Sequence, residues 1–458
     1  MLYRKAYEKL KEWKQQTHRK ALCIVGARQI GKTTIIREFG RREYQSFVEI
    51  NFATDPKASE IFADSYVAEV LITNLTAYAQ QPMEPYKTLI LFDEVQECPQ
   101  VRTAIKFLVE DGRFDYVESG SLLGQRYKEI LSYPVGFEEI YRMYPLDFEE
   151  FILANGVQDS TIQHLRECFE RLTPVSNSVH ETMCRLFYSY MVVGGMPEAV
   201  RIYTETHDIG QVVSYQREIL ELYRLDIAKY AMGNDRIKIK AIFDSIPAQL
   251  NEKNRRFILR DIAPNGRQNR YENSFLWLSD AGVALPCYNV AEPKQPLQLN
   301  EKHNLFKLFH CDTGLLCAAC MENIQWELLQ GNMAINLGSI LENMMAQQLT
   351  ANGFSLNYFA TKKIGELDFL VSKGMKVLQI EVKSGKDYKK HPALTRMMAV
   401  EAWKGNSSYV LCKGNIEAEH GIIYLPWYQV MFLRQEKIPV NMKYEVDISG
   451  LEKKEDDL

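Results

Sequence analysis

The residues with the clearest chemical potential form a loop near the start of the chain. Residues 26–33 read Gly-Ala-Arg-Gln-Ile-Gly-Lys-Thr, which fits the G-x-x-x-x-G-K-[ST] pattern, and they lie between a short apolar run and an apolar-periodic segment. In such a loop the two glycines let successive backbone N–H groups point at one anion, and the positive end of the following helix adds to the attraction. The pattern therefore predicts a nucleotide-phosphate site between a strand and a helix.

The side chains of this loop have separate expected roles. Lys32 is expected to reach the β- and γ-phosphates, and the Thr33 hydroxyl is expected to hold Mg²⁺. The complete predicted contact set is Gly26, Ala27, Arg28, Gln29, Ile30, Gly31, Lys32, Thr33 and Thr34. Because the loop reads phosphates only, it does not distinguish ATP from GTP. A simple glycine-containing turn is the alternative interpretation of an eight-residue pattern.

A buried strand that ends in two carboxylates is the expected partner of this loop. Residues 88–94 read Thr-Leu-Ile-Leu-Phe-Asp-Glu. We expect Asp93 to hold Mg²⁺ through its water shell and Glu94 to orient or deprotonate the attacking water. Ser119 or Ser121, at the end of the next expected strand, could face the γ-phosphate, although a serine at a strand end is also a common helix cap. An acidic pair after a strand can equally be a solvated loop.

The bulk composition sets the broad class of the protein. A chain of 458 residues is too long for one core, so two to four domains are expected. A net charge of −4 gives no global nucleic-acid signature, so a site of that kind must be a local patch. No apolar run approaches the roughly 18 residues of a membrane helix, and no secretory signal opens the chain. We therefore expect a cytoplasmic protein with no membrane partner and with reduced cysteines.

Strand and helix patterns alternate over residues 20–150, which predicts a parallel sheet covered by helices on both faces. Residues 151–234 then show helical periodicity.

Residues 235–300 have the outline of a winged helix-turn-helix. The expected helices cover 236–250, 256–262 and 268–281, and extended runs cover 283–290 and 296–299. Residues 253–270 hold six Lys and Arg against one acid, so a DNA-contacting face is plausible. A lid or an oligomer contact is the alternative for this segment.

A second acidic constellation follows. Glu342 lies in an apolar helical pattern, Asp368 heads an apolar strand, and Glu381 and Lys383 are two apart on a strand, so that both project from one face. This order suits a metal-dependent phosphodiesterase: Asp368 and Glu381 share a cation, Glu342 supports it, and Lys383 positions water or stabilises charge on phosphorus. Surface charges at strand ends are the alternative. Residues 331–413 hold 11 Lys and Arg against 6 Asp and Glu, a local positive excess.

With both constellations in hand, the chain resembles a large prokaryotic group of predicted AAA-like, STAND-like ATPases. The motifs that carry the resemblance are GARQIGKTT, LILFDEVQ, ESGSLLG, YPLDFEEF, VGGMPEAV, FKLFHCDTGLL, LEN and GELDFLV with IEVKSG. The resemblance implies an α/β P-loop ATPase domain, a helical and winged-helix middle, and a restriction-endonuclease-like end resembling PD-(D/E)xK nucleases. In this chain the Asp of that motif arrives in ELD rather than PD.

The expected domain boundaries follow from the patterns and the resemblance together. They are a P-loop AAA-like domain (1–150), a helical region (151–234), a winged helix (235–300), a nuclease-like domain (301–435) and an acidic tail (436–458). Carried over from the family, Lys32 and Glu94 act in nucleotide hydrolysis. Glu342, Asp368, Glu381 and Lys383 match the nuclease-like site.

Two functional hypotheses follow. In the first, the protein is an ATP-binding, Mg²⁺-dependent ATPase whose nucleotide state controls a nuclease-like, DNA-associated domain. In the second, that C-terminal part is a non-cleaving module that binds nucleic acid or protein, and the ATPase is a switch. A protein partner or a homo-oligomer fits either hypothesis. A third possibility keeps the loop but makes the protein a GTPase or a kinase.

Overall fold

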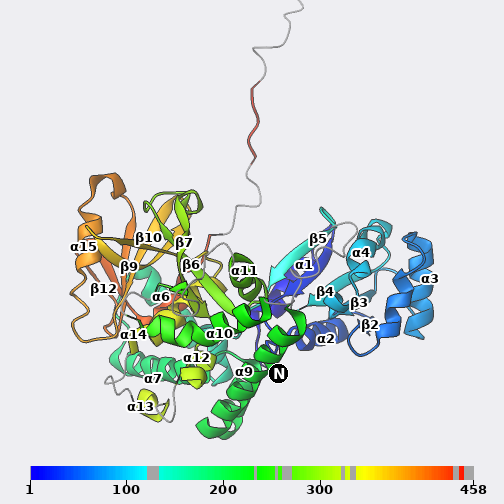
Figure 1. The fold of residues 1–458 in the computed structure, drawn as a ribbon, viewed down its shortest axis with the longest axis horizontal. Helices are drawn as coiled ribbons and strands as arrows, with labels where there is room; N and C mark the ends of the chain where they lie inside the picture. The colour runs from blue at the N-terminus through cyan, green and yellow to red at the C-terminus, as the bar shows by residue number, and fades with distance from the viewer. Residues whose placement is uncertain are drawn as a thin grey trace, which may run out of the picture.

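Two β-sheets dominate the computed structural model, which describes residues 2–120, 134–231, 235–252, 256–259, 271–320, 325–330, 337–436 and 443–447. The N-terminal sheet, blue to cyan in Figure 1, lies at one end of the molecule, and the second sheet lies at the other end. Helices from the middle of the chain lie between them. Within these ranges, no helix has the length and apolar character needed to cross a bilayer.

The N-terminal sheet is parallel throughout and has the strand order β2-β3-β4-β1-β5. Its strands are β1 (Ala21–Val25), β2 (Ser46–Asn51), β3 (Thr88–Asp93), β4 (Asp115–Gly120) and β5 (Glu138–Arg142). Every residue of β1 and β3 is buried, as their continuous apolar runs indicate for strands covered on both faces. The predicted parallel α/β sheet is confirmed.

Two helix layers bury the two faces of this sheet. The helices are α1 (Lys5–Lys14), α2 (Lys32–Glu43), α3 (Ala68–Ala79) and α4 (Gln100–Asp111), with short 3-10 turns η1 (Pro56–Phe62) and η2 (Val95–Glu97). Leu89 and Leu91 of β3 share a core with Trp13 of α1. Ile90 and Phe92 share a second core with α3 and α4. Successive residues of one strand therefore pack against opposite layers, as the pleat of a strand requires.

A helical region follows the sheet. Its helices are α5 (Phe148–Ala154), α6 (Asp159–Arg171), α7 (Asn177–Val193), α8 (Pro197–Thr206), α9 (Ile209–Tyr230), α10 (Asp235–Asn251), α11 (Glu272–Asp280), α12 (Thr313–Cys320) and α13 (Gln325–Leu329). A capping box starts α5, because Asp147 accepts from the Glu150 N–H at 2.9 Å and Glu150 accepts from the Asp147 N–H at 3.0 Å. The helix α12 packs against α7 and α9 and also against α14 (Leu337–Ala351), and so joins this region to the C-terminal part.

The second sheet is mixed and has the order β12-β13-β11-β10-β9-β8-β6-β7. Its strands are β6 (Ala284–Val290), β7 (Glu301–His310), β8 (Asn357–Thr361), β9 (Gly365–Lys373), β10 (Lys376–Val382), β11 (Ser407–Cys412), β12 (Glu417–Glu419) and β13 (Ile422–Pro426). Helix α14 (Leu337–Ala351) packs on β6, β7 and β10. Helix α15 (Pro392–Met398) contributes Leu394 and Met397 to a separate core. The remaining 3-10 turns are η6 (Leu297–Asn300), η7 (Glu401–Trp403) and η8 (Trp427–Phe432).

The predicted winged helix differs from the structure in its hairpin. The run 296–299, expected to be extended, lies mostly in the turn η6 (Leu297–Asn300), and the second strand is β7, which begins at Glu301. The hairpin is not an independent wing, because β6 also pairs with β8 and extends the second sheet. The expected boundary at residue 300 therefore falls between two paired strands. A hairpin pattern is local, whereas the sheet that it joins is set by distant residues.

Two further expected segments are only partly described. Residues 256–258, placed in a helix by the sequence, are not helical, and the Phe257 N–H donates to Phe306 O at 2.9 Å. The rest of the basic segment, residues 260–270, lies outside the described residues. Of the expected acidic tail, residues 443–447 are exposed and form neither helix nor strand.

Candidate functional site

The phosphate loop connects β1 to α2. Gly26 and Gly31 have φ angles of +149° and +87°, a region that residues with a Cβ rarely adopt. At Gly26 the space excludes a side chain as well, because a Cβ would lie 2.3 Å from Met143 O. The loop leads into the N-terminus of α2, where unpaired N–H groups and the helix dipole favour a bound anion.

Lys32 folds back over this loop. Its Nζ donates to Gly26 O at 2.9 Å and to Ala27 O at 2.8 Å. Burial lowers the pKa of Lys32 to about 8, because the charged form loses its hydration, and nearby Glu94 and Asp93 oppose this shift. The ammonium is thus held at the loop before any phosphate arrives, which reduces the ordering that binding requires.

Thr33 meets the carboxylate at the end of β3, as the sequence predicts. Its Oγ1 lies 3.1 Å from Asp93 Oδ1. Asn51 Nδ2 donates to Asp93 Oδ2 at 2.8 Å, and Ser119 Oγ donates to Asp93 Oδ1. The strand register explains this cluster, because Asn51 pairs with Asp93 and Asp93 pairs with Ser119 across three parallel strands.

The outcome for the predicted contacts around Asp93 is mixed. Asn51 was missed by the sequence analysis. Its only signal there is a polar residue at the end of a strand. Ser119 is the serine that reaches the carboxylate, whereas Ser121 lies outside the described residues. A threonine hydroxyl beside a carboxylate is a set of hard oxygen donors that fits Mg²⁺.

Glu94 follows β3 directly. It is half-buried and has a φ of +55°, a left-handed conformation that costs a non-glycine residue of order 1–3 kcal/mol. Gln96 Nε2 donates to Glu94 Oε2 and holds that carboxylate. Strained backbone at the edge of a sheet next to a phosphate loop is consistent with a functional position.

The remaining loop residues contact the rest of the protein. Arg28 Nη1 lies 2.6 Å from Asp226 Oδ1, and the Tyr223 hydroxyl donates to Arg28 O at 3.0 Å, so both contacts come from α9. Ile30 is buried, and its carbonyl accepts from Arg4 Nη1 at 2.9 Å. The side chains of Gln29 and Thr34 are exposed. The Arg28 side chain, placed in the phosphate-contacting set by the sequence, thus faces α9 in this structure.

The second constellation also assembles. Glu342 comes from α14, Asp368 from β9, and Glu381 and Lys383 from the end of β10; all four line one cavity of about 320 Å³. Lys383 Nζ lies 2.7 Å from Glu381 Oε1, which confirms that the two side chains share a face. Asp368 Oδ2 accepts from the Val382 N–H at 2.8 Å. Burial, followed by the charge of Asp368, raises the pKa of Glu381 to about 7.

One residue of this site was missed. Lys307, in β7, is fully buried, and its Nζ lies 3.5 Å from Glu342 Oε2 and 2.7 Å from Glu366 Oε1. The signal in the sequence is a lysine inside the apolar run Leu-Phe-Lys-Leu-Phe, residues 305–309. A strand covered on both faces leaves such a lysine buried, and a buried ammonium needs acidic partners.

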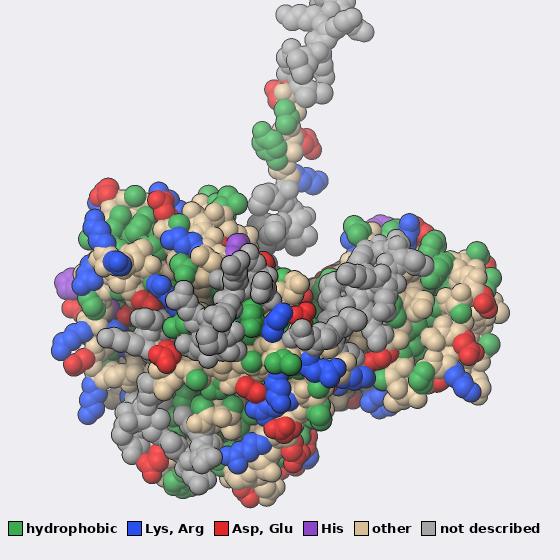
Figure 2. Space-filling model, viewed as in Figure 1, with side chains coloured by type: hydrophobic (Ala, Val, Ile, Leu, Met, Phe, Trp, Pro, Cys, Tyr) green, Lys and Arg blue, Asp and Glu red, His purple; other side chains and the backbone are tan. Residues whose placement is uncertain are grey.

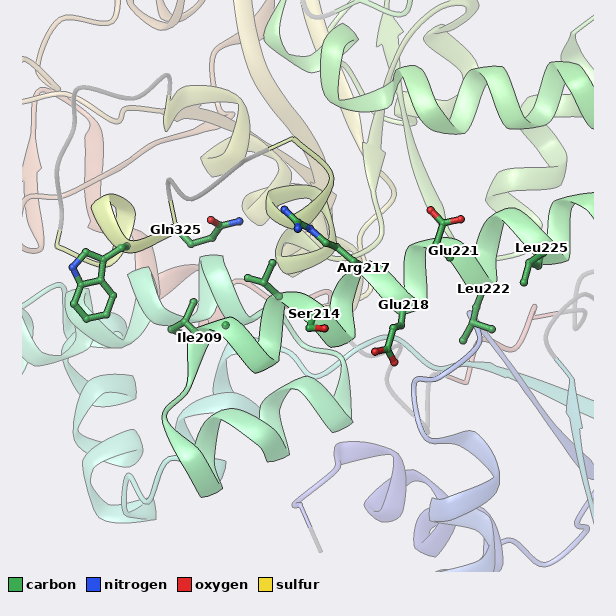
Figure 3. Close-up of a pocket in the computed structure, with 11 residues that line it drawn as sticks. Ile209, Ser214, Arg217, Glu218, Glu221, Leu222, Leu225 and Gln325 are labelled. Atoms are coloured by element: carbon green, nitrogen blue, oxygen red, sulfur yellow. The ribbon is translucent and has the colours of Figure 1, made fainter.

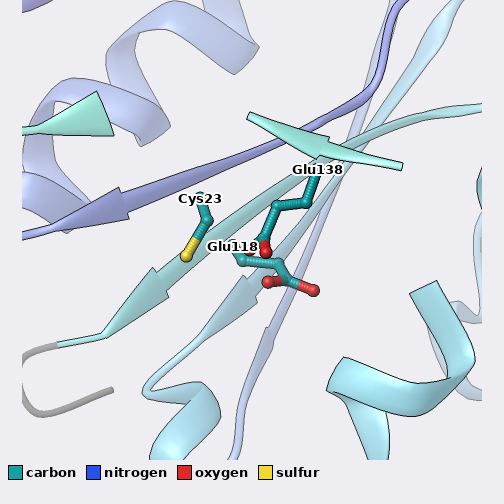
Figure 4. Close-up of side chains that lie close together, drawn as sticks. All are labelled: Cys23, Glu118 and Glu138. Carbon is teal, nitrogen blue, oxygen red and sulfur yellow. The ribbon is translucent and has the colours of Figure 1, made fainter. Parts of the chain in front are cut away.

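A buried cluster of side chains on the N-terminal sheet is held by an ion pair and is not a metal site. Cys23, Glu118 and Glu138 point toward one another from neighbouring strands (Figure 4), and among the described residues theirs is the set with metal-ligand atoms within 4.8 Å of one another. Arg102 already fills this space: it donates to Glu118 Oε2 at 2.7 Å, to Glu138 Oε2 at 2.7 Å and to the Cys23 sulfur at 3.2 Å. The guanidinium replaces the cation that such a set could otherwise hold.

A further cavity lies away from both sites. It measures about 890 Å³ and follows α9, and Gln325 and Trp326 also line it. Figure 3 shows its lining side chains spread along the helix rather than converging on one point, so it lacks the concentrated polar groups of a catalytic site.

Most of the predicted basic segment, residues 253–255 and 260–270, lies outside the described residues. On the face in Figure 2, Lys and Arg are interspersed with Asp and Glu. Arg256, from the predicted basic segment, is half-buried near Tyr358.

Comparisons with protein families divide the chain into three parts. Residues 18–152 match a family described as an AAA domain. Residues 184–326 and residues 337–430 match two families described as domains of unknown function. Among curated proteins, none matches this chain.

Solved structures give distant similarities. A Walker-type ATPase of Pyrococcus abyssi is 14% identical with a TM-score of 0.41, and the match covers 70% of this chain and 96% of that one. An Orc1 protein of Aeropyrum pernix in complex with DNA is 11% identical with a TM-score of 0.28, covering 72% and 93%. RuvB of Thermotoga maritima is 14% identical with a TM-score of 0.29, covering 62% and 89%. With TM-scores this low, these similarities carry no functional argument. The AAA family match, together with the geometry of the phosphate loop, shows that the chain carries an AAA-type ATPase domain, which indicates ATP binding.

Proposed function

We propose that the protein is a Mg²⁺-dependent ATPase whose nucleotide state controls a nuclease-like site in its C-terminal part. The contact between Thr33 and Asp93 carries the first half of this proposal, because it brings the last hydroxyl of the phosphate loop against the carboxylate that ends β3. Bound Mg²⁺ supplies a Lewis acid that neutralises charge on the β- and γ-phosphates. Lys32 binds the same phosphates, and Glu94 accepts a proton from the attacking water.

Steady-state ATP turnover of the full-length protein tests the ATPase. Lys32→Ala is expected to lower kcat/KM by about 10²–10³-fold, because it removes a cation that stabilises the transition state. Glu94→Gln is expected to lower kcat by about 10²–10⁴-fold while ATP still binds. Lys57→Ala, at an exposed lysine of the same domain, is the matched control and should keep full turnover. Equal turnover in all four proteins would refute the proposal.

The nuclease-like site is supported by an unsatisfied oxygen. Glu381 Oε2 is buried and has no hydrogen-bond partner among the described residues, while Asp368 lies close enough to raise the pKa of Glu381. Asp368 and Glu381 would hold a divalent cation, which would remove both costs. When bound there, the cation would supply the Lewis acid that activates water for attack on a phosphodiester. In this arrangement Lys383 stabilises the charge that develops on phosphorus.

The link between the two sites is helix α14, which carries Glu342 toward its start and two glutamines near its end. Gln347 and Gln348 donate to the Tyr190 hydroxyl at 3.0 and 3.1 Å, and Tyr190 donates in turn to Leu146 O. Gln348 Oε1 also accepts from the Phe148 N–H at 3.1 Å. The helix that bears one site is thus fixed to the segment leaving the ATPase sheet.

Arg4 links that segment to the phosphate loop. Arg4 donates to Ile30 O at 2.9 Å and to Tyr144 O at 2.7 Å, and its Nε lies 3.2 Å from Glu150. A change in the loop on nucleotide binding therefore acts on residues that hold α14. Coupling through packed, hydrogen-bonded elements of this kind is typically 1–3 kcal/mol.

The alternative is a non-cleaving module that binds nucleic acid or protein. The ion pair between Lys383 and Glu381 favours it, since the ammonium already neutralises one candidate ligand. Divalent-dependent cleavage of DNA, with and without ATP, separates the two: Glu381→Ala should abolish cleavage and leave ATP turnover intact. Salt-dependent DNA binding that survives Glu381→Ala, without cleavage by the unmutated protein, would favour the binding module.

A further inference from the structure

The second site contains a buried lysine, Lys307, that is not among the residues predicted from the sequence. Lys307 enters from the β6–β7 hairpin, within the segment matched by one family, whereas the four predicted residues lie in the segment matched by another. Its Nζ lies 5.0 Å from the centroid of the Tyr358 ring in addition to its two carboxylate contacts. A fully buried ammonium costs several kcal/mol unless paired, so the site is built around this charge.

The carboxylates of the site fall into two groups. Glu342 and Glu366 lie within 3.5 Å of the Lys307 ammonium. Asp368 and Glu381 come from adjacent antiparallel strands and face the cavity. Within the described part of the chain, Glu342, Asp368 and Glu381 do not bring their ligand atoms within 4.8 Å of one another. Glu342 is therefore placed as a partner of Lys307 rather than as a third ligand of one ion.

The net charge of the site also favours a single metal ion. Glu342, Glu366, Asp368 and Glu381 are balanced in part by Lys307 and Lys383, which leaves an excess of two negative charges when all are ionised. One divalent cation balances that excess, and a second would reverse it. A two-metal site needs ions about 3.5–4 Å apart with ligands on both sides, and the ammonium takes up the Glu342 side.

We propose that Lys307 stands in for a second metal ion, so that the C-terminal site binds a single divalent cation through Asp368 and Glu381. This inference rests on the proposed metal site and specifies its stoichiometry. Lys307 acts as a positioning residue: it pairs with Glu342, so that this carboxylate serves the ammonium and not the bound ion.

Titration of the full-length protein with Mn²⁺ alone, followed by the electron paramagnetic resonance signal of free Mn²⁺, tests the inference without any activity assay. The number of ions assigned to the site is the number lost in Asp368→Asn. The expected number for the unmutated protein is one. Lys307→Met removes the fixed cation and is expected to add a second ion or to tighten the first by about tenfold or more. Lys307→Arg keeps the charge and should bind one ion.

Two further variants separate an effect on Mn²⁺ binding from an effect on folding. Lys302→Met changes a lysine of the same strand outside the site and should leave Mn²⁺ binding unchanged. Glu342→Gln should also leave one ion bound with an affinity within about threefold, because Glu342 is not a ligand in this account. If Lys307→Met fails to fold, the Mn²⁺ affinity of Glu342→Gln tests the inference instead.

The inference is overturned by two ions in the unmutated protein, by no ion lost in Asp368→Asn, or by a tenfold weaker ion in Glu342→Gln. It is equally overturned if folded Lys307→Met binds like the unmutated protein. Its failure is distinct from failure of the proposed nuclease. One bound ion with no DNA cleavage rejects the nuclease alone, and two bound ions with cleavage reject only the present inference.

Discussion

The Gly195 N–H donates a 2.6 Å hydrogen bond to Asp312 Oδ2. Gly195 itself lies so close to the segment leaving the first sheet that a Cβ would be 2.1 Å from Leu146 O. Asp312 is fully buried and caps α12, since the Leu315 N–H donates to its Oδ1 at 3.0 Å. One carboxylate thus joins the corner between α7 and α8, which packs against Leu146, to the start of α12.

Asp312→Asn is expected to lower the free energy of unfolding by about 1–3 kcal/mol, because the amide N–H₂ faces backbone donors that then lack an acceptor. Asp208→Asn is the matched control: Asp208 also caps a helix, accepting from the Gln211 N–H at 3.1 Å, but it is exposed. Asparagine caps a helix about as well as aspartate, so that control should cost only tenths of a kcal/mol. Urea unfolding measures both, and equal losses would show that the Gly195 contact is not stabilising.

ATP binding should weaken as pH rises above about 8. Burial sets the pKa of Lys32 to about 8 in the free protein, and bound phosphates raise it by favouring the ammonium. Below that pH the lysine is already charged and affinity is flat; above it, affinity falls by up to tenfold per pH unit. Equilibrium titrations between about pH 7 and pH 9.5 measure this, with Lys32→Arg as a comparison that stays charged and should be flat. A flat profile for the unmutated protein would contradict the buried state of Lys32.

Removing the Arg102 guanidinium should strongly lower the stability of the folded protein. Arg102→Leu leaves Glu118 and Glu138 buried without their cation and is expected to cost about 3–5 kcal/mol. Burial outweighs the attraction of Arg102 and raises the pKa of Glu118 to about 8, so Glu118→Gln resembles the form present at neutral pH and should be mild.

The same carboxyl group gives a pH test. The folded protein keeps the Glu118 proton that the unfolded chain releases near its usual pKa of 4.5, so this residue makes stability fall as pH rises from about 4.5 to about 8. Glu118→Gln should lessen that fall, as measured by the free energy of unfolding at both ends of the range. An unchanged pH dependence would mean that Glu118 is ionised in the folded state.

Contacts that depend on local sequence were predicted correctly, whereas contacts that depend on strand order and register were not. Lys32, Thr33 and Asp93 were predictable because the loop is contiguous and a parallel sheet brings strand ends to one edge. The same rule predicted that Ser119 or Ser121 faces the γ-phosphate, and Ser119 reaches Asp93. Asn51 was not identified, since its contact depends on the order and register of β2 and β3, which no local pattern encodes.

In the C-terminal part the division is similar. Glu381 and Lys383 share a face because they are two apart on a strand, which the sequence states directly. Lys307 joins them only because β6 pairs with β8 and places the hairpin beside the site, and the winged-helix interpretation of that hairpin concealed this. Distant pairing, rather than local propensity, is what the sequence left undetermined.

The Tyr190 hydroxyl offers the sharpest test of communication between the two sites. If α14 links them, a non-hydrolysable ATP analogue should change the Mn²⁺ affinity of the second site, and Mn²⁺ should change the affinity for the analogue by the same factor, typically about 5–150-fold. Tyr190→Phe removes the group that joins Gln347 and Gln348 to Leu146, so it should reduce this factor toward one while each ligand alone still binds.

Tyr188→Phe is the matched control, because its hydroxyl is buried on the same helix and has no hydrogen-bond partner among the described residues. Calorimetric titrations of one ligand with and without the other measure the factor. Coupling that persists in Tyr190→Phe would place the connection elsewhere, and its absence from the unmutated protein would mean that the two sites act independently.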